Sequence, residues 1–285
     1  MFTIDSGSTV AYSLGSNFSR LYVFSPLPVE HQVSMNLLRT NQRTFNVPNS
    51  FRAQLSKKLM IKLRLQLFME MTGDISSQKG KLRRSIWSKM EREGLTLFPK
   101  PCFGRIPNFL GADRAAARLK EIPEYRRAKI VLVNPDAAQA PVRMMALLDG
   151  KTVVMPTPRL RRGFLILEPD RVRGKERLAS TIKGAFKYGR IAKALPKVDF
   201  VVEGCVAVDK TGNRLGKGGG YGDKEIKLAK RVSKLVKVAT TCHSTQVVDK
   251  VPFNESDEKV DYIATENDLI RIDGKTEGKG PLKGS

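Results

Sequence analysis

The chain has 285 residues, of which 41% are hydrophobic, and it carries a formal net charge of +23. This length and apolar content allow one large packed domain or two small ones, and they exclude disorder along the whole chain. The sparse cysteines and histidines exclude a disulfide framework and a zinc site built on these residues, so a reducing compartment is expected.

The basic charge has two readings. An excess of Lys and Arg attracts nucleic acid, anionic membranes or polyanionic small molecules such as ATP. It is also a general surface property of some proteins. The sequence has no apolar run long enough to cross a bilayer and no secretory signal pattern. We therefore expect a cytoplasmic protein without a membrane partner.

Residues 1–70 differ in composition from the rest, because they are rich in Ser, Asn, Thr and Gln and poor in acidic residues. Three interpretations of this extension stay open: a transit peptide that would place the protein in an organelle matrix, a basic arm for a polyanion, or a mis-assigned start with the true one at Met71. We expect one folded domain over residues 71–273 and a flexible tail over residues 274–285.

The first predicted helix covers residues 78–93, where the apolar residues Leu82, Ile86, Trp87 and Met90 share one face before Gly94 ends it. The Pro-rich stretch 98–111 predicts an extended, ordered loop. A second helix is expected over residues 112–119. Strands and helices then alternate.

Apolar β-branched runs predict strands at residues 129–134, 151–156, 164–168, 198–208, 237–243 and 260–265. Helical patterns cover residues 142–149, 179–185 and 224–236. The strand at 198–208 is expected to be long and central, with a kink at its glycine. Strands separated by helices predict an α/β fold with a mostly parallel sheet flanked by helices.

A glycine-rich loop between a predicted strand and a predicted helix carries the strongest functional signal, and it runs from Arg214 to Asp223. Its glycines, Gly216, Gly218, Gly219 and Gly220, leave backbone N–H groups open to an anion at the start of the helix. Arg214 and Lys217 supply cations for phosphate oxygens, and the Asp223 carboxylate suits Mg²⁺. This pattern is neither a Walker loop nor a dinucleotide-binding fingerprint. The sequence therefore predicts a nucleotide triphosphate site.

Lys79 and Arg83 form a second candidate. Four residues apart on a helix, they project from one face and could hold phosphates together.

These segments resemble the 5-formyltetrahydrofolate cyclo-ligase (methenyltetrahydrofolate synthetase) family. The resemblance covers about Lys79 to Ile272 and is strongest to the branch of methenyltetrahydrofolate synthetase domain-containing proteins. It rests on Lys79-Gly-Lys-Leu-Arg83, the loop Arg214 to Tyr221 with Asp223, Gln246, the passage from Val251 to Thr265 with Asp257, the Pro-rich passage Phe98 to Gly111, and Pro156 to Arg161.

The resemblance implies a single α/β domain that binds ATP and Mg²⁺ at the glycine loop. It implies an enzyme that converts 5-formyltetrahydrofolate, or a related formylated pterin, to the 5,10-methenyl form through a phosphorylated formyl group. Lys79, Arg83 and Arg214 would contact phosphates, with Lys79 and Arg214 as catalytic groups, and the backbone of Gly216 to Gly220 would cradle them. Tyr221 would line the site, and Asp223 would serve the metal.

The chain departs from the family pattern at three places. The loop ends Gly220-Tyr-Gly-Asp-Lys224 where the enzymes read Gly-Tyr-Tyr-Asp-Arg, and Asn134 to Gln139 stands where they carry a folate-side glutamate. Ser256-Asp257 replaces a His-Asp pair. The alternative functions are a non-catalytic nucleotide- or RNA-binding regulatory protein on the same fold, with weak RNA binding, and an ATP-using enzyme with a different acceptor.

Overall fold

The computed structural model describes residues 75–272, and all of these residues belong to one compact unit. The expected extension over residues 1–70 and the tail over residues 274–285 lie outside the described residues. Within the described part, none of the helices has the length and apolar character that a bilayer crossing needs.

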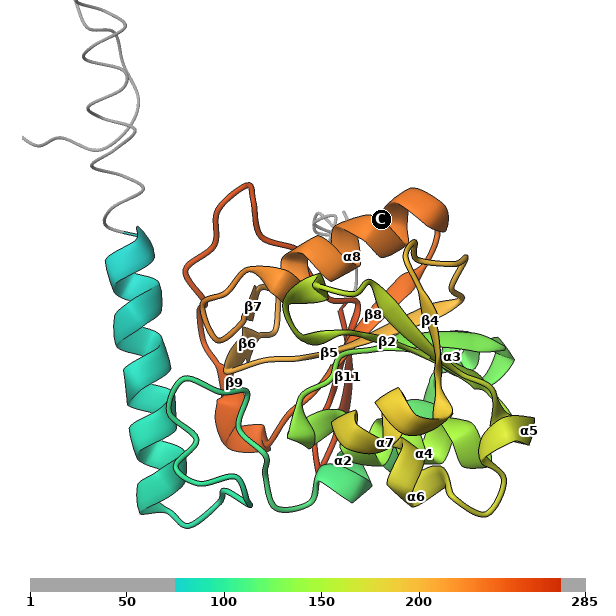
Figure 1. Cartoon of the computed structure of the whole chain (residues 1–285). Coiled ribbons are helices and arrows are strands. Elements are labelled where there is room, and N and C mark those ends of the chain that lie inside the picture. Colours follow the sequence, from blue (N-terminus) through green and yellow to red (C-terminus); the bar gives the residue numbers. More distant parts are fainter. Residues whose placement is uncertain (1–74, 273–285) are drawn as a thin grey trace, which may run out of the picture. The chain divides into compact units, whose positions relative to one another are not determined.

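A large mixed sheet forms the centre of the domain (Figure 1). Its strand order is β11-β10-β8-β5-β1-β2-β3-β4. The five central strands run parallel, whereas β3, β4 and β11 pair antiparallel at the two edges. The strands are β1 (Ile130–Val133), β2 (Thr152–Pro156), β3 (Phe164–Leu167), β4 (Arg190–Ala192), β5 (Phe200–Gly204), β8 (Lys237–Thr241), β10 (Tyr262–Ala264) and β11 (Leu269–Arg271).

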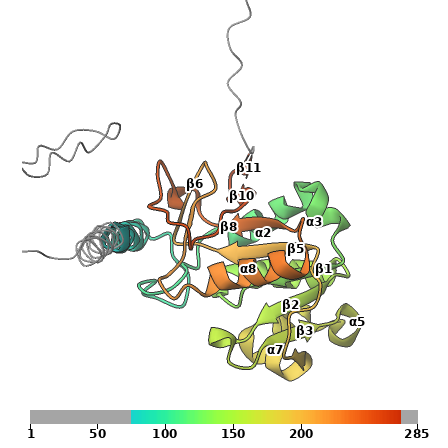
Figure 2. The same ribbon diagram turned by 90° about the horizontal axis from the view of Figure 1, so that it is seen from above.

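Helices cover both faces of this sheet, with α8 on one face and α2, α4, α6 and α7 on the other (Figures 1 and 2). A first helix spans residues 75–92. The others are α2 (Ala112–Arg118), α3 (Pro123–Arg127), α4 (Ala140–Leu148), α5 (Pro169–Val172), α6 (Glu176–Ala179), α7 (Ile182–Tyr188) and α8 (Tyr221–Val232), with 3-10 turns η1 (Leu119–Glu121), η2 (Ala137–Gln139), η3 (Pro158–Leu160) and η4 (Ser244–Gln246). The α/β class with a mostly parallel sheet is confirmed.

Each central strand is buried on both faces, which explains why it reads as a continuous apolar run. In β1, Val131 and Val133 pack toward α4, while Leu132 packs toward Ile226 of α8. A third apolar cluster lies between the helix over residues 75–92, the Pro-rich segment and a small second sheet. That sheet has the order β7-β6-β9, formed by β7 (Arg214–Leu215), β6 (Ala207–Asp209) and β9 (Val247–Val248).

The predicted long strand over residues 198–208 was wrong. The chain leaves the large sheet after Gly204 and enters the small sheet at Ala207. A Cβ atom at Gly204 would lie 2.7 Å from both Gln139 Oε1 and Ile106 Cγ2, so only glycine allows the close approach at which the chain changes sheet.

Two predicted helices also differ. The helix predicted over residues 179–185 is divided between α6 and α7, because the Thr181 side chain caps a new helix by accepting a hydrogen bond from the Gly184 N–H. The helix predicted over residues 224–236 is α8, which begins at Tyr221 and ends at Val232. Tyr221 and Asp223 therefore belong to its first turn rather than to the glycine loop.

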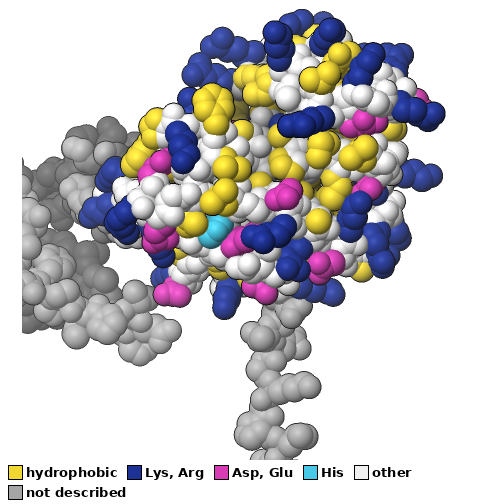
Figure 3. Space-filling model, turned by 90° about the horizontal axis from the view of Figure 1, so that it is seen from below, with side chains coloured by type: hydrophobic (Ala, Val, Ile, Leu, Met, Phe, Trp, Pro, Cys, Tyr) yellow, Lys and Arg dark blue, Asp and Glu magenta, His cyan; other side chains and the backbone are white. Residues whose placement is uncertain are grey.

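Basic side chains are spread over the protein surface. Figure 3 shows Lys and Arg around the whole of the face seen from below, interspersed with apolar and acidic side chains. On this face the charge is therefore distributed, not gathered into one continuous stripe.

Candidate functional site

The glycine loop connects β7 to α8, and its backbone requires glycine at two positions. Gly218 has a φ angle of +109° and Gly220 has one of +66°. Residues other than glycine adopt such backbone angles only with strain. Gly220 is the N-cap residue of α8, and no side chain caps the helix there. The first N–H groups of α8 thus remain available to an anion, together with the positive end of the helix dipole.

Arg214 lies in β7 and is 4% exposed. It is therefore a buried residue beneath the glycine loop and not a surface residue of the loop. Its guanidinium donates hydrogen bonds to the Gly204 carbonyl at 3.1 Å and to Asp223 Oδ1 at 2.8 Å. Burial lowers the pKa of Arg214, but the carboxyl groups of Asp223 and Glu203 outweigh burial and raise it. Arg214 is therefore a fixed positive charge below the loop.

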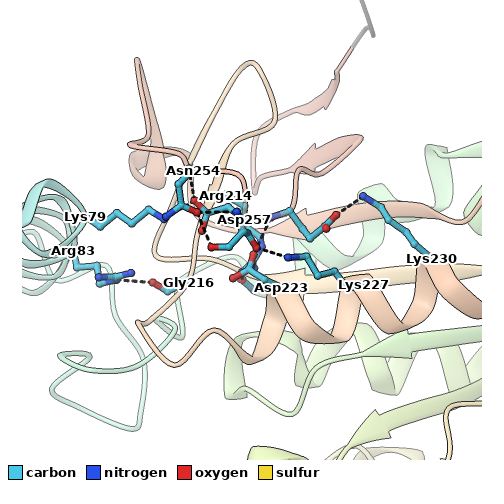
Figure 4. Close-up of polar contacts among 12 residues, drawn as sticks. Lys79, Arg83, Arg214, Gly216, Asp223, Lys227, Lys230, Asn254 and Asp257 are labelled. Atoms are coloured by element: carbon cyan, nitrogen blue, oxygen red, sulfur yellow. Dashed lines mark hydrogen bonds and ion pairs between the residues drawn. The ribbon is translucent and has the colours of Figure 1, made fainter. Parts of the chain in front are cut away.

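Lys79 and Arg83 point from the helix over residues 75–92 toward the same region (Figure 4). Lys79 Nζ forms an ion pair with Asp257 Oδ2 at 2.5 Å, and Arg83 Nε donates to the Gly216 carbonyl at 2.8 Å. The ideal Cβ position of Gly218 lies 3.7 Å from Arg83 Cζ. The structure thus brings the two sequence motifs together, because Arg83 packs directly against the glycine loop.

Asp223 and Asp257 form ion pairs with this cluster, Asp223 with Arg214 and Asp257 with Lys79. Asp223 Oδ1 accepts from Arg214 and from the Glu258 N–H at 3.1 Å, and Asp257 Oδ2 accepts from Lys79 and from the Asn254 N–H at 2.8 Å (Figure 4). Within residues 75–272, no group of three or more metal-ligating side chains gathers. Mg²⁺ is commonly held by one or two carboxylates together with substrate phosphates, which these residues fit.

A cavity of about 780 Å³ opens on the inner side of the loop. The loop residues and Arg214, Tyr221 and Asp223 line one part of it. Lys217 reaches across to Asp136, which follows β1, in an ion pair of 2.6 Å. Of the predicted site residues, Lys79 and Arg83 lie on the outer side of the loop, while all the others except Gly218 line the cavity. Gly218 faces Arg83 instead of the cavity.

Two buried acids, Glu203 and Glu225, also line the cavity, and sequence reasoning missed both. Burial and then the charge of Glu225 raise the pKa of Glu203 well above its usual range. Burial likewise raises the pKa of Glu225 to about 7, although its hydrogen bond with Glu203 lowers it. The raised pKa favours the protonated form of the Glu203 carboxyl, which donates a hydrogen bond to Glu225. The available signal was Glu203 itself, a charged residue inside the apolar run of β5.

Gly222 explains one departure from the family pattern. A Cβ atom there would lie 2.9 Å from Arg214 Nη2 and 3.1 Å from Glu203 Oε2. The buried carboxyl and the guanidinium therefore occupy the space that a larger side chain would need.

The carboxyl pair makes the stability of the protein depend on pH. Since the folded-state pKa of Glu225 is raised, the stabilisation is complete below its unfolded value and is lost as the pH rises through about 7. In buffer without divalent cations, we expect the free energy of unfolding to fall by roughly 1–3 kcal/mol between about pH 5 and pH 8. Urea unfolding measures this. Glu225→Gln should flatten the profile, whereas Glu255→Gln, at an exposed position, should not; an unchanged profile for Glu225→Gln would contradict the assignment.

Comparisons with known proteins identify the family. A sequence model of the 5-formyltetrahydrofolate cyclo-ligase family matches residues 75–266. The chain is 38% identical over 214 residues to a methenyltetrahydrofolate synthase domain-containing protein of Bos taurus, covering 71% of this chain and 55% of that protein. It is 37% identical over 209 residues to the Homo sapiens protein of the same name, covering 69% and 54%. The chain thus spans about half the length of these relatives.

Among solved structures, the NMR structure of Aquifex aeolicus 5,10-methenyltetrahydrofolate synthetase matches with a TM-score of 0.46 and 22% identity, covering 70% of this chain and 96% of that one. The resemblance inferred from the sequence motifs is confirmed by the family match and by the curated relatives. The chain belongs to the 5-formyltetrahydrofolate cyclo-ligase family.

Proposed function

We propose that the protein is an ATP- and Mg²⁺-dependent cyclo-ligase that converts 5-formyltetrahydrofolate, or a related formylated pterin, to its 5,10-methenyl form. The observation that carries the proposal is the glycine loop, which lies between Arg83 on one side and the buried Arg214 on the other, at the uncapped start of α8. Such a concentration of N–H groups and fixed cations suits a triphosphate.

In this proposal the triphosphate lies along Gly216 to Gly220. Lys217 exchanges Asp136 for a phosphate oxygen, which opens its ion pair across the cavity. Lys79 and Arg83 act from the outer side, and Tyr221 lines the cavity beside Gly220. Asp223 and Asp257 would hold Mg²⁺, which neutralises phosphate charge when it is bound.

The chemistry needs positioning and charge stabilisation more than a protein nucleophile. The terminal phosphoryl group passes from ATP to the formyl oxygen, leaving ADP. N10 of the folate then attacks the formyl carbon, and loss of the N10 proton and of phosphate completes the methenyl bridge. Arg214 holds a fixed charge below the loop during the transfer. The three cysteines are buried and unpaired, which fits a reducing compartment such as the cytoplasm.

The test is formation of the methenyl chromophore by the full chain with 5-formyltetrahydrofolate, ATP and Mg²⁺. Lys79→Ala/Arg83→Ala should raise the KM for ATP by roughly 10- to 100-fold, because two charged contacts are lost. Lys81→Ala/Arg84→Ala is the matched control, since it removes the same charge from exposed positions of the same helix.

Each negative outcome has a definite meaning. Without chromophore but with ATP binding in calorimetry, folate is not the acceptor, and a different acceptor or a regulatory nucleotide-binding role takes its place. Without ATP binding, the nucleotide site itself is refuted. RNA affinity that falls steeply with salt and is unaffected by the Lys79→Ala/Arg83→Ala change would favour the RNA-binding alternative.

A further inference from the structure

The cavity has a second end, bordered by Lys217 of the glycine loop, with a different chemistry. Pro99 and Ile106 of the Pro-rich segment line one side of it, and Pro158 and Ile182 line the other. An adjoining hollow of about 320 Å³ extends along the Pro-rich segment, and the ion pair of Asp136 and Lys217 lines it as well. These apolar surfaces suit a flat ring system more than a phosphate chain.

Arg159 projects into this end from the turn after β2. Arg159 and Leu160 have φ values of +57° and +55°, a left-handed conformation that costs free energy in residues with side chains. The turn is fixed at its base, where Thr157 Oγ1 accepts from the Arg162 N–H at 3.0 Å. At its other end, a Cβ atom on Gly163 would lie 2.3 Å from the Ala192 carbonyl oxygen. The turn is therefore packed tightly against β4 and keeps Arg159 at the cavity.

Arg105 lines the cavity from the Pro-rich segment. Its backbone N–H donates to the Cys102 carbonyl at 3.0 Å, and its own carbonyl accepts from Trp87 Nε1 at 3.0 Å. Trp87 is 8% exposed, so the position of Arg105 is tied to a buried side chain. Each of the two walls of the cavity thus carries an arginine whose backbone is fixed by hydrogen bonds or tight packing.

Neither guanidinium group has an ion-pair or hydrogen-bond partner within residues 75–272, whereas Lys217 and Arg214, the other cations lining the cavity, are paired with carboxylates. Arginine binds carboxylate and phosphate groups in a bidentate manner. Two arginines without acidic partners, facing one cavity from segments far apart in the sequence, indicate a place for an anionic group.

We propose that Arg105 and Arg159 bind an anionic group of the second substrate, a carboxylate or a phosphate, while its ring system lies on the apolar wall between them. The assignment of the opposite end to ATP rests on the proposed function. The second substrate is thus a planar heterocycle with an anionic tail, and 5-formyltetrahydrofolate, with its glutamate carboxylates, is one molecule of this class.

The first experiment uses turnover. Arg105→Gln/Arg159→Gln should raise the KM for 5-formyltetrahydrofolate by roughly 10- to 100-fold, as expected for loss of charge-assisted hydrogen bonds. The KM for ATP should change less than about twofold, since Arg83, Arg214 and Lys217, the proposed phosphate contacts, are unchanged. Arg92→Gln/Arg161→Gln removes the same net charge from exposed positions that do not line the cavity, and it should behave like the wild type. An equal change in both double variants, or in both KM values, overturns the proposal.

The second experiment needs no turnover and separates the two anions. Calorimetric titrations use 4-aminobenzoylglutamate as the carboxylate probe and 4-aminobenzyl phosphate as the phosphate probe. The wild type and the control should bind one of them, and Arg105→Gln/Arg159→Gln should not. If the wild type binds neither probe, the anion site is refuted even if methenyl product forms. If a probe binds in this way but no methenyl product forms, the anion site stands and folate turnover is refuted.

Discussion

Arg214→Met is expected to abolish measurable cyclo-ligase turnover and to destabilise the protein at the same time. The substitution leaves the partly buried Asp223 carboxylate and the buried Glu203 carboxyl beside an uncharged side chain. Breaking a buried ion pair by removing one partner costs about 3–5 kcal/mol of unfolding free energy. Loss of a fixed cation at a transferring phosphoryl group lowers kcat by roughly a thousandfold or more.

Two variants separate these effects. Arg214→Met/Asp223→Asn removes the orphaned carboxylate and should recover part of the stability in urea unfolding without restoring turnover. Arg214→Lys keeps the charge but not the two-armed contact with Gly204 and Asp223, and it should retain a small fraction of the activity. Turnover by Arg214→Met close to that of the wild type would show that this guanidinium has no part in the reaction.

Arg143→Met is expected to have the second-largest effect, and it acts through the shape of the cavity. Arg143 is 1% exposed, and its guanidinium donates to the carbonyls of Ser180 at 2.7 Å, of Asp136 at 3.1 Å and of Asn134. Burial lowers the pKa of Arg143 to about 10, while Asp136 raises it, so the group stays charged at neutral pH. Methionine would remove the guanidinium donor from the carbonyls of Ser180 and Asn134, whereas the Asp136 carbonyl still accepts from the Gln139 N–H at 3.1 Å.

The expected loss is about 3–5 kcal/mol of unfolding free energy, since each unsatisfied buried group costs about 1–3 kcal/mol and the site relaxes in part. Urea unfolding measures it. Because Arg143 fixes the segment from Asn134 to Asp136, which lines the cavity, the KM values should also rise in the fraction that remains folded. Arg118→Met, in an exposed i,i+3 ion pair, is the control and should change stability by less than about 1 kcal/mol. A similarly small change for Arg143→Met would contradict the role assigned to it.

The sequence was sufficient to predict the central strands and the glycine loop, because both have strong local signals. β1 and β8 are β-branched runs buried on both faces, and the loop glycines are needed for positive φ angles and close approach. The small sheet could not be predicted from such signals. β7 and β9 are two residues long, and a period cannot be read from two residues.

Residues whose roles depend on distant partners were also beyond the sequence pattern. Glu203 and Arg143 each stand as one charge in an otherwise apolar strand or helix, and their partners lie in other elements. Arg83 and the Gly216 carbonyl are in contact although they lie 133 residues apart in the sequence. The spacing of residues within either motif does not predict this contact. The family resemblance supplied that link where local physics could not.

The contact between Trp87 and Arg105 has a practical consequence for optical measurements. Trp87 is the only tryptophan of the chain, and the centroids of its ring and of the Phe103 ring lie 5.9 Å apart. Its indole N–H donates a hydrogen bond to the backbone carbonyl of Arg105, a residue of the cavity wall. Intrinsic fluorescence is therefore dominated by one chromophore at one place. A shift of its emission on adding a ligand reports movement of the Pro-rich wall itself, without any label.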